Sequence, residues 1–123
     1  MKIAFASTDG KTVNRTFDQA RDFTIWHLHG TQLRNAGKRS AITTNRFDRA
    51  CQQARLSAIA DCDLVCSLDI APEAAAQVAR HLFHLKTIRE CAISEILDRL
   101  RRVAAGTPPP WLQKALRDDD EAR

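Results

Sequence analysis

The chain has 123 residues, of which 44% are hydrophobic and 28% are charged. This composition is typical of a single globular domain and excludes an intrinsically disordered chain. Lys and Arg exceed Asp and Glu by 19 to 15, which gives a formal charge of +4. This modest excess favours an anionic partner, but the basic residues are dispersed and do not predict nucleic-acid binding.

No apolar run approaches the roughly 18 residues that a membrane-spanning helix needs. The apolar run after Lys2 is also too short for a signal peptide. We therefore expect a cytoplasmic protein with no membrane partner and with reduced cysteines. The four cysteines form no C-x-x-C pair, so a structural zinc site is not expected.

The first elements along the chain are predicted strands. Residues 2–7 form an apolar run that ends in a glycine turn. Residues 23–29 alternate with a period of two, and a further strand is expected over residues 32–43, interrupted at Gly37. These three strands predict an antiparallel β-meander.

The period then changes to that of amphipathic helices. Apolar residues three and four positions apart predict helices over residues 47–58, 71–82 and 93–103. Asn45 and Asp48 are placed to cap the first of these helices. Pro72 suits the first turn of the second helix, and Gly106 terminates the third.

Two short apolar strands separate the helices, over residues 63–68 and 84–89. The order is thus three strands followed by helix–strand–helix–strand–helix. Right-handed crossovers make the first strand parallel to the last two and leave the meander as an antiparallel edge. We therefore predict an α/β domain over residues 1–106, with a mixed sheet in which an antiparallel meander precedes βαβα units.

Residues 107–123 are expected to form a short tail. Thr107 and the three prolines after it form a stiff extended spacer. The residues from Trp111 to Leu116 are expected to form an amphipathic turn or two before an acidic end. The Trp111 segment either docks in a groove of a partner or folds back on its own domain. The sequence leaves both alternatives open.

Small polar residues follow the first predicted parallel strand, where ligands gather in open α/β sheets. Ser7, Thr8, Asp9 and Gly10 are small enough to leave backbone N–H groups accessible, and Arg15 follows within reach. Because N–H groups and arginine favour negative charge, we expect an anion site there. The alternative is a tight turn without a ligand, since these residue types dominate turns.

Two cysteines are candidate metal ligands. Cys66 lies near the carboxyl end of a buried strand and is either a ligand or a core thiol. Cys91 lies at a helix start, where a thiolate is stabilised. Cys51 is expected in the core, and the charges beside Cys62 disfavour its thiolate.

Two histidine pairs are further candidates for metal sites. His27 and His29 share one face of a predicted strand, and His81 and His84 share one face of a predicted helix. Neither pair has a third ligand nearby in the sequence. Polar outer faces therefore explain both pairs better than metal binding.

Three stretches of the sequence form a family pattern. Residues 1–14 read MKIAFASTDGKTVN, residues 61–65 read DCDLV, and between them F-x-x-A-x-x-F-x-I runs from Phe17 to Ile25. This pattern resembles the dinitrogenase iron–molybdenum cofactor biosynthesis family. The proline-containing tail with WLQKAL at residues 111–116 is similar to the NifX-like branch.

The resemblance implies a ribonuclease H-like fold and a non-catalytic carrier. Such a carrier binds the iron–molybdenum cofactor, or its iron–sulfur precursor, and escorts it between nitrogenase cofactor assembly proteins. The cluster is anionic and its iron atoms accept thiolate or imidazole ligands. The expected cofactor-binding residues are Ser7, Thr8, Asp9, Gly10, Arg15, Thr16, Phe17 and Cys66, with Cys66 and Cys91 as metal ligands.

The sequence departs from the family pattern at two places. Where the family reads H-F-G, this chain has Thr16, Phe17 and Asp18. Threonine is a poor iron ligand, and Asp18 adds negative charge beside the expected anion site. After the later strand, Asp69 precedes Ile70 and Ala71 where the family commonly has a glycine. Either the ligand role has moved to Cys66 or the chain is a divergent paralogue with a different cargo.

Two other functions stay open on the sequence alone. A ribonuclease H-like nuclease holds two metal ions between carboxylates, and Asp9, Asp69 and Glu90 are roughly placed for this. The fold alone does not confer that chemistry. A protein-interaction module without a cluster would instead use the Trp111 segment. The carrier function predicts no nucleic-acid partner.

Overall fold

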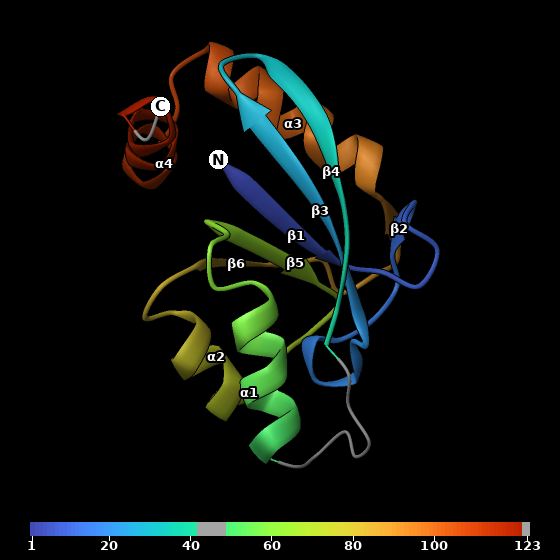
Figure 1. Ribbon diagram of the computed structural model, residues 1–123. Coiled ribbons are helices and arrows are strands. Elements are labelled where there is room, and N and C mark those ends of the chain that lie inside the picture. Colours follow the sequence, from blue (N-terminus) through green and yellow to red (C-terminus); the bar gives the residue numbers. More distant parts are fainter. Residues whose placement is uncertain (42–48, 122–123) are drawn as a thin grey trace.

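The computed structural model describes residues 1–41 and 49–121. Its centre is a five-stranded mixed sheet in the order β4-β3-β1-β5-β6 (Figure 1). The strands are β1 (Lys2–Ala6), β3 (Asp22–His29), β4 (Gln32–Ser40), β5 (Leu64–Ser67) and β6 (Phe83–Lys86). β3 is antiparallel to β1 and β4, whereas β1, β5 and β6 are parallel. The predicted mixed α/β architecture with an antiparallel meander is confirmed.

Helices cover both faces of this sheet. The described helices are α1 (Arg49–Ala58), α2 (Pro72–Val78), α3 (Ile93–Ala105) and α4 (Pro110–Glu121), with a 3-10 turn, η1 (Phe17–Gln19). Residues of α1 and α2 share one hydrophobic cluster with the sheet, and residues of α3 and α4 share the other. Among these helices, none is long and apolar enough to cross a membrane.

The structure adds a small element that the sequence pattern does not predict. A small second sheet, β2 (Thr12–Val13) paired with β7 (Cys91–Ala92), was not expected because two-residue strands carry no periodic pattern. The expected cap residues Asn45 and Asp48 lie outside the described residues. Pro72 begins α2, and Gly106 follows α3, as predicted.

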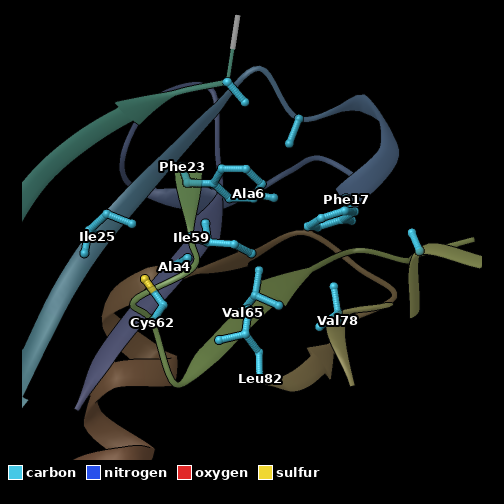
Figure 2. Packing of buried hydrophobic residues seen from close by; sticks show 13 residues of the cluster. Ala4, Ala6, Phe17, Phe23, Ile25, Ile59, Cys62, Val65, Val78 and Leu82 are labelled. Carbon is cyan, nitrogen blue, oxygen red and sulfur yellow. The ribbon is translucent and has the colours of Figure 1, made fainter. Parts of the chain in front are cut away.

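β1 is buried on both faces because its residues alternate between two cores. Ala4 and Ala6 lie in the cluster on the α1 and α2 side (Figure 2), and Ile3 and Phe5 lie in the cluster on the α3 and α4 side. All four side chains are fully buried. Burying one large apolar side chain of this kind contributes about 1.5–3 kcal/mol. Packing on both faces of the sheet therefore holds β1 in place.

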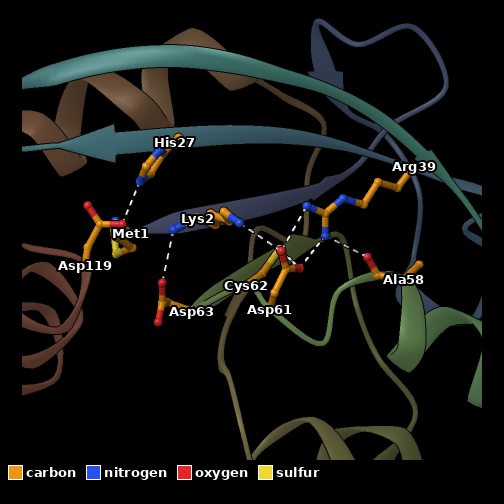
Figure 3. Close-up of polar contacts among 9 residues, drawn as sticks. All are labelled: Met1, Lys2, His27, Arg39, Ala58, Asp61, Cys62, Asp63 and Asp119. Atoms are coloured by element: carbon orange, nitrogen blue, oxygen red, sulfur yellow. Dashed lines mark hydrogen bonds and ion pairs between the residues drawn. The ribbon is translucent and has the colours of Figure 1, made fainter. Parts of the chain in front are cut away.

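Asp61 connects the start of β1 to β4 and to the end of α1 (Figure 3). Its carboxylate accepts a hydrogen bond from Lys2 Nζ at 3.0 Å and forms an ion pair with Arg39, which also donates to the Ala58 carbonyl at 3.1 Å. The hydrogen bond from Arg39 holds the pKa of Asp61 well below its usual range. Burial, followed by the charge of Asp61, raises the pKa of Cys62 to about 12. Cys62 is thus a protonated core thiol.

α4 is longer than the turn or two expected, and it packs on its own domain. Leu112 is fully buried and Ala115 is nearly so. The Trp111 ring stacks on Phe83 of β6 with 4.4 Å between ring centroids. Pro110 is the first residue of the helix, where its missing N–H has no cost. Of the two alternatives for the tail, the structure shows the fold-back.

Asp119 lies in the last turn of α4 and contacts residues of the sheet (Figure 3). We call these contacts the α4 latch. Its Oδ1 lies 2.7 Å from His27 Nε2 and 3.1 Å from the Met1 amino group, and its Oδ2 lies 2.7 Å from His29 Nδ1. Burial opposes ionisation of Asp119, but the hydrogen bonds from His29, His27 and Met1 together hold its pKa below the ordinary value. The two histidines of β3 thus anchor a helix.

Replacing Asp119 tests the α4 latch. Asp119→Asn is expected to lower the free energy of unfolding by about 1–3 kcal/mol, because it removes the charged acceptor of several hydrogen bonds. The folded pKa lies below the ordinary value of 3.8. The stabilisation is therefore complete above that value and is lost as the pH falls through the folded pKa.

Urea unfolding of the two proteins at neutral and at acidic pH measures this difference, which should shrink in acid. Asp118→Asn, at an exposed position of the same helix, is the matched control. Equal midpoints for the two variants at neutral pH would contradict the α4 latch.

Candidate anion-binding site

The segment from Ser7 to Gly10 follows β1 as a turn closed by its own hydrogen bonds. Asp9 Oδ1 accepts the backbone N–H groups of Lys11 and Thr12 at 2.9 Å, and the hydroxyls of Ser7 and Thr12 at 3.0 Å. Gly10 donates its N–H to Ser7 Oγ at 2.9 Å and adopts φ +73°, which glycine tolerates best. Residues 7–10 therefore form the tight turn that was the alternative to an anion site.

Closing the turn occupies backbone donors that an anion would otherwise use. The N–H of Thr8 donates to Asn14 Oδ1 at 3.0 Å, and Asn14 Nδ2 donates to Thr8 Oγ1 at 2.7 Å. The N–H groups of Gly10, Lys11 and Thr12 are used by Ser7 and Asp9 as described above. The expectation of accessible N–H groups is therefore wrong at these positions, because acceptors of the loop itself bind them.

A polar hollow with a volume of about 420 Å³ lies beside this turn, and we call it the arginine hollow. It is lined by Ser7, Thr8, Arg15, Gln19, Arg21 and Asp22. Arg15 and Arg21 are exposed, and neither forms an ion pair within residues 1–41 and 49–121. Asp22, the carboxylate of the lining, lies 3.9 Å from Lys38 Nζ. The balance of charge is positive, and guanidinium groups suit carboxylate or other oxyanion ligands.

Three of the predicted site residues, Ser7, Thr8 and Arg15, line the arginine hollow together. The structure adds a second cation to this lining, Arg21. Arg21 was missed because it lies after the predicted turn, at an unspecified (x) position of the F-x-x-A-x-x-F-x-I pattern. The 3-10 turn η1 reverses the chain between Arg15 and Arg21, so that both reach the same hollow. The sequence feature that could have indicated this pairing is the short Phe-Asp-Gln segment between Arg15 and Arg21.

Thr16 and Phe17 join the hollow to the centre of the sheet. The Phe17 N–H donates to the Asp69 carbonyl, and the Leu68 N–H donates to the Arg15 carbonyl, both at 2.9 Å. The Phe17 ring is fully buried against Phe23, with 5.9 Å between ring centroids. Thr16 precedes η1 and makes no capping bond with its side chain. Phe17, which is among the expected cofactor-binding residues, therefore lies in the core.

Asp18 is bound to α2 and α1. Its Oδ2 accepts the Ala71 N–H at 2.7 Å, and its Oδ1 accepts Gln52 Nε2 at 2.6 Å. A carboxylate at the N-terminus of a helix is stabilised by the helix dipole. Asp18 is absent from the lining of the arginine hollow. The negative charge of Asp18 is thus used to hold α1 and α2.

Cys66 does not reach the arginine hollow. Its register opposite Phe5 places it on the α3 side of the sheet, in the cluster with Phe5 and Ile93, and it is fully buried. Burial raises the pKa of its thiol far above the usual range. The expectation that Cys66 shares one site with Ser7 and Arg15 is therefore not met, because its sulfur lies in the hydrophobic core.

Cys91 also differs from its expected state. It lies half-buried in β7, and burial followed by the charge of Glu95 raises the pKa of its thiol. A stabilised thiolate at the helix start is therefore not found. Neither Cys91 nor Cys66 lines the arginine hollow.

His84 has a different setting from the one predicted. α2 ends at Val78, so His81 and His84 do not share a helix face, and His84 lies on β6. His84 Nε2 lies 2.7 Å from Ser67 Oγ, which donates to the Asp69 carbonyl at 3.0 Å. Burial lowers the pKa of His84 and favours the neutral ring. This contact between neighbouring parallel strands was not visible in the sequence.

The carboxylates proposed for a nuclease are engaged elsewhere. Asp9 is held within its own turn, and Asp69 forms an ion pair with Lys86 at 3.4 Å. Within the described part of the chain, no group of three His, Cys, Asp or Glu residues is placed to hold a metal ion. The two-metal arrangement of Asp9, Asp69 and Glu90 is therefore not formed.

The sequence pattern of the family described as "Dinitrogenase iron-molybdenum cofactor" matches residues 1–106. The chain belongs to this family. It is 33% identical to protein NifY of Azotobacter vinelandii over 125 residues, which cover 100% of this chain and 51% of that protein. It is 28% identical to protein NifX of Herbaspirillum seropedicae over 130 residues, which cover 98% of this chain and 85% of that protein. The chain thus spans about half the length of the NifY relative.

A solved structure shares the fold of this family member. The crystal structure of PH0822 matches it with a TM-score of 0.66 at 16% sequence identity, covering 83% of this chain and 91% of that chain. At this identity the likeness concerns the fold alone. Membership of the dinitrogenase iron–molybdenum cofactor family connects the chain with nitrogen fixation and with biosynthesis of that cofactor.

Replacing Asp9 tests how the turn beside the hollow is held. Asp9→Ala is expected to speed hydrogen exchange at the Lys11 and Thr12 amides, because it removes their shared acceptor. The N–H groups of Lys11 and then Thr12 hold the pKa of Asp9 well below the ordinary 3.8. The turn should thus stay protected as the pH falls to that value and lose protection only as it falls through the folded pKa.

Amide exchange followed by NMR measures both effects. Asp69→Ala removes an exposed carboxylate from a different loop and should leave the Lys11 and Thr12 amides unchanged. Slow exchange at these amides in Asp9→Ala would contradict the assignment.

Proposed function

We propose that this chain is a non-catalytic carrier that binds the iron–molybdenum cofactor, or its iron–sulfur precursor, during cofactor assembly. The observation that carries the proposal is the arginine hollow at the carboxyl end of β1, where Arg15 and Arg21 have no ion-pair partner among the described residues. Guanidinium groups bind carboxylates and other anions through paired hydrogen bonds. Family membership supports the class of cargo.

The arginine hollow would hold its cargo by charge and hydrogen bonds. Its lining contains no cysteine and no histidine, the side chains that iron in clusters prefer. Thr16 stands where the resemblance to the family places a histidine, and Cys66 is buried. A hold of this kind weakens with salt and is readily reversed. Reversible binding suits a protein that passes its cargo to another.

The scaffold supports the same proposal. We infer a ribonuclease H-like arrangement from the strand order β4-β3-β1-β5-β6 with β3 antiparallel to its neighbours. Because Asp9 and Asp69 are engaged in the turn and in an ion pair, the carrier function is favoured over a nuclease. We propose nitrogenase cofactor assembly proteins as the donor and the recipient of the cargo.

Cluster loading under anaerobic conditions tests the proposal. The protein is incubated with isolated cofactor or its precursor, separated by gel filtration, and analysed for iron, molybdenum and visible absorption. We expect the wild-type protein to retain metal and the double variant Arg15→Ala/Arg21→Ala to bind roughly ten-fold more weakly, a difference of about 1.4 kcal/mol. Raising the salt concentration should release the metal, because the interaction is electrostatic.

Two further variants serve as controls. Arg34→Ala removes an exposed arginine from the far end of β4, opposite His27, and should leave loading unchanged. Cys66→Ala should also retain its cluster when its circular dichroism spectrum is native. Full loading of the double variant, or loss of the cluster from natively folded Cys66→Ala, would refute the proposed site.

A further inference from the structure

The two arginines of the hollow are attached to the sheet in different ways. Arg21 immediately precedes β3, and its carbonyl accepts the Ala41 N–H at 2.8 Å, so the meander itself holds it. Arg15 lies outside every helix and strand, and its carbonyl accepts the N–H of Leu68, in the loop after β5, at 2.9 Å. The position of Arg15 relative to Arg21 therefore depends on how that loop is held.

A chain of hydrogen bonds runs from β6 through this loop to the backbone beside Arg15. His84 Nε2 lies 2.7 Å from Ser67 Oγ, and the Ser67 hydroxyl donates to the Asp69 carbonyl at 3.0 Å. The same carbonyl accepts the Phe17 N–H at 2.9 Å, two residues beyond Arg15. Ser67 is fully buried at the centre of this chain. We call these contacts, from His84 to Phe17, the Ser67 relay.

The donors and acceptors of the Ser67 relay fix the tautomer of His84. A serine hydroxyl has one proton to donate, and Ser67 donates it to the Asp69 carbonyl. The contact between Ser67 Oγ and His84 Nε2 therefore requires the proton on Nε2. Since burial lowers the pKa of His84 and favours the neutral ring, Nδ1 is left without a proton. His84 thus acts as the first donor of the relay.

Backbone hydrogen bonds from the end of β6 hold the same loop. The Thr87 N–H donates to the Ser67 carbonyl and the Ile88 N–H donates to the Leu68 carbonyl, both at 2.9 Å. Ile88 makes this bond at φ +65°, which is unfavourable for a β-branched residue. Such a conformation persists where the surrounding contacts over-determine it, often near a functional site. The loop after β5 is thus fixed on its β6 side and can hold the backbone of the hollow on its other side.

We propose that Ser67 and His84 are positioning residues that hold Arg15 beside Arg21, so that both guanidinium groups contact one anion. The inference rests on the proposed function of the arginine hollow and adds two residues that lie outside its lining. Groups that are held in place by supporting hydrogen bonds lose less conformational freedom when a ligand binds. Without the relay, the backbone on either side of Thr16 moves more, and the two arginines meet the same anion less often.

Phosphate binding followed by NMR tests the Ser67 relay. Inorganic phosphate is added to the full, cluster-free chain at a pH where His84 is neutral, and the Nε–H signals of Arg15 and Arg21 are followed. In the wild-type protein both signals should shift with one dissociation constant. His84→Ala and Ser67→Ala leave the net charge unchanged, yet each should weaken phosphate binding by roughly two- to ten-fold. Each should also speed hydrogen exchange at the Phe17 amide.

A conservative variant separates positioning from a general loss of structure. His84→Gln keeps an N–H donor for Ser67 Oγ and should restore most of the phosphate affinity. His81→Ala removes an exposed histidine two residues before β6 and is the matched control, with wild-type affinity and wild-type exchange. Nitrogen-15 spectra of the wild-type protein should show the Nε2–H tautomer of His84. Circular dichroism confirms that each variant has the native fold.

Four results would overturn the Ser67 relay. They are wild-type phosphate affinity in both alanine variants, equal loss of affinity in His84→Ala and His84→Gln, the Nδ1–H tautomer of His84, and wild-type arginine signals that phosphate does not shift. The carrier function is judged separately by cofactor loading. A wild-type protein that binds phosphate as described but retains no cofactor contradicts the carrier function and supports the relay. Normal loading together with unimpaired phosphate binding in both alanine variants contradicts the relay alone.

Discussion

The burial of residues 3–6 of β1 is the constraint on which the rest of the structure depends. Its two hydrogen-bonding edges are taken by β3 and β5, and its two faces by separate hydrophobic clusters. Small side chains, Ala4 and Ala6, face α1 and α2, whereas Ile3 and Phe5 face α3 and α4. A strand enclosed in this way has no free surface except at its ends. The loop after Ala6 is therefore held at a fixed position, and the arginine hollow forms beside it.

The elements of the domain could be predicted wherever one physical signal dominates. The alternation over residues 23–29 predicts a strand, because a period of two places alternate residues on one face of a sheet, and the short apolar run at residues 2–7 is bounded by a glycine turn, as a buried strand would be. The tail over residues 107–123 has no alternation of this kind. A helix as short as α4 is marginal on its own, and it is held by packing and by contacts such as that between Asp119 and His29, 90 positions apart in the chain. No local pattern reports a contact of that range.

The candidate site could be predicted only in part. Position at a strand end was enough to group Ser7 with Arg15, but it could not show that the donors of the turn are directed at Asp9. The direction of Cys66 depends on its register with Phe5. A shift of one residue would turn the thiol to the opposite face, and a strand that is apolar on both faces does not reveal its register. These features required coordinates because they depend on which atoms face each other.

The α4 latch and the arginine hollow lie at opposite ends of β1. Met1, which contacts Asp119, precedes the strand, and Ser7, which lines the hollow, follows it. Five residues of extended chain separate the two, a length of about 17 Å. A partner contact confined to α4 therefore touches none of the residues that line the hollow. The domain can be held at one pole while a ligand enters or leaves at the other.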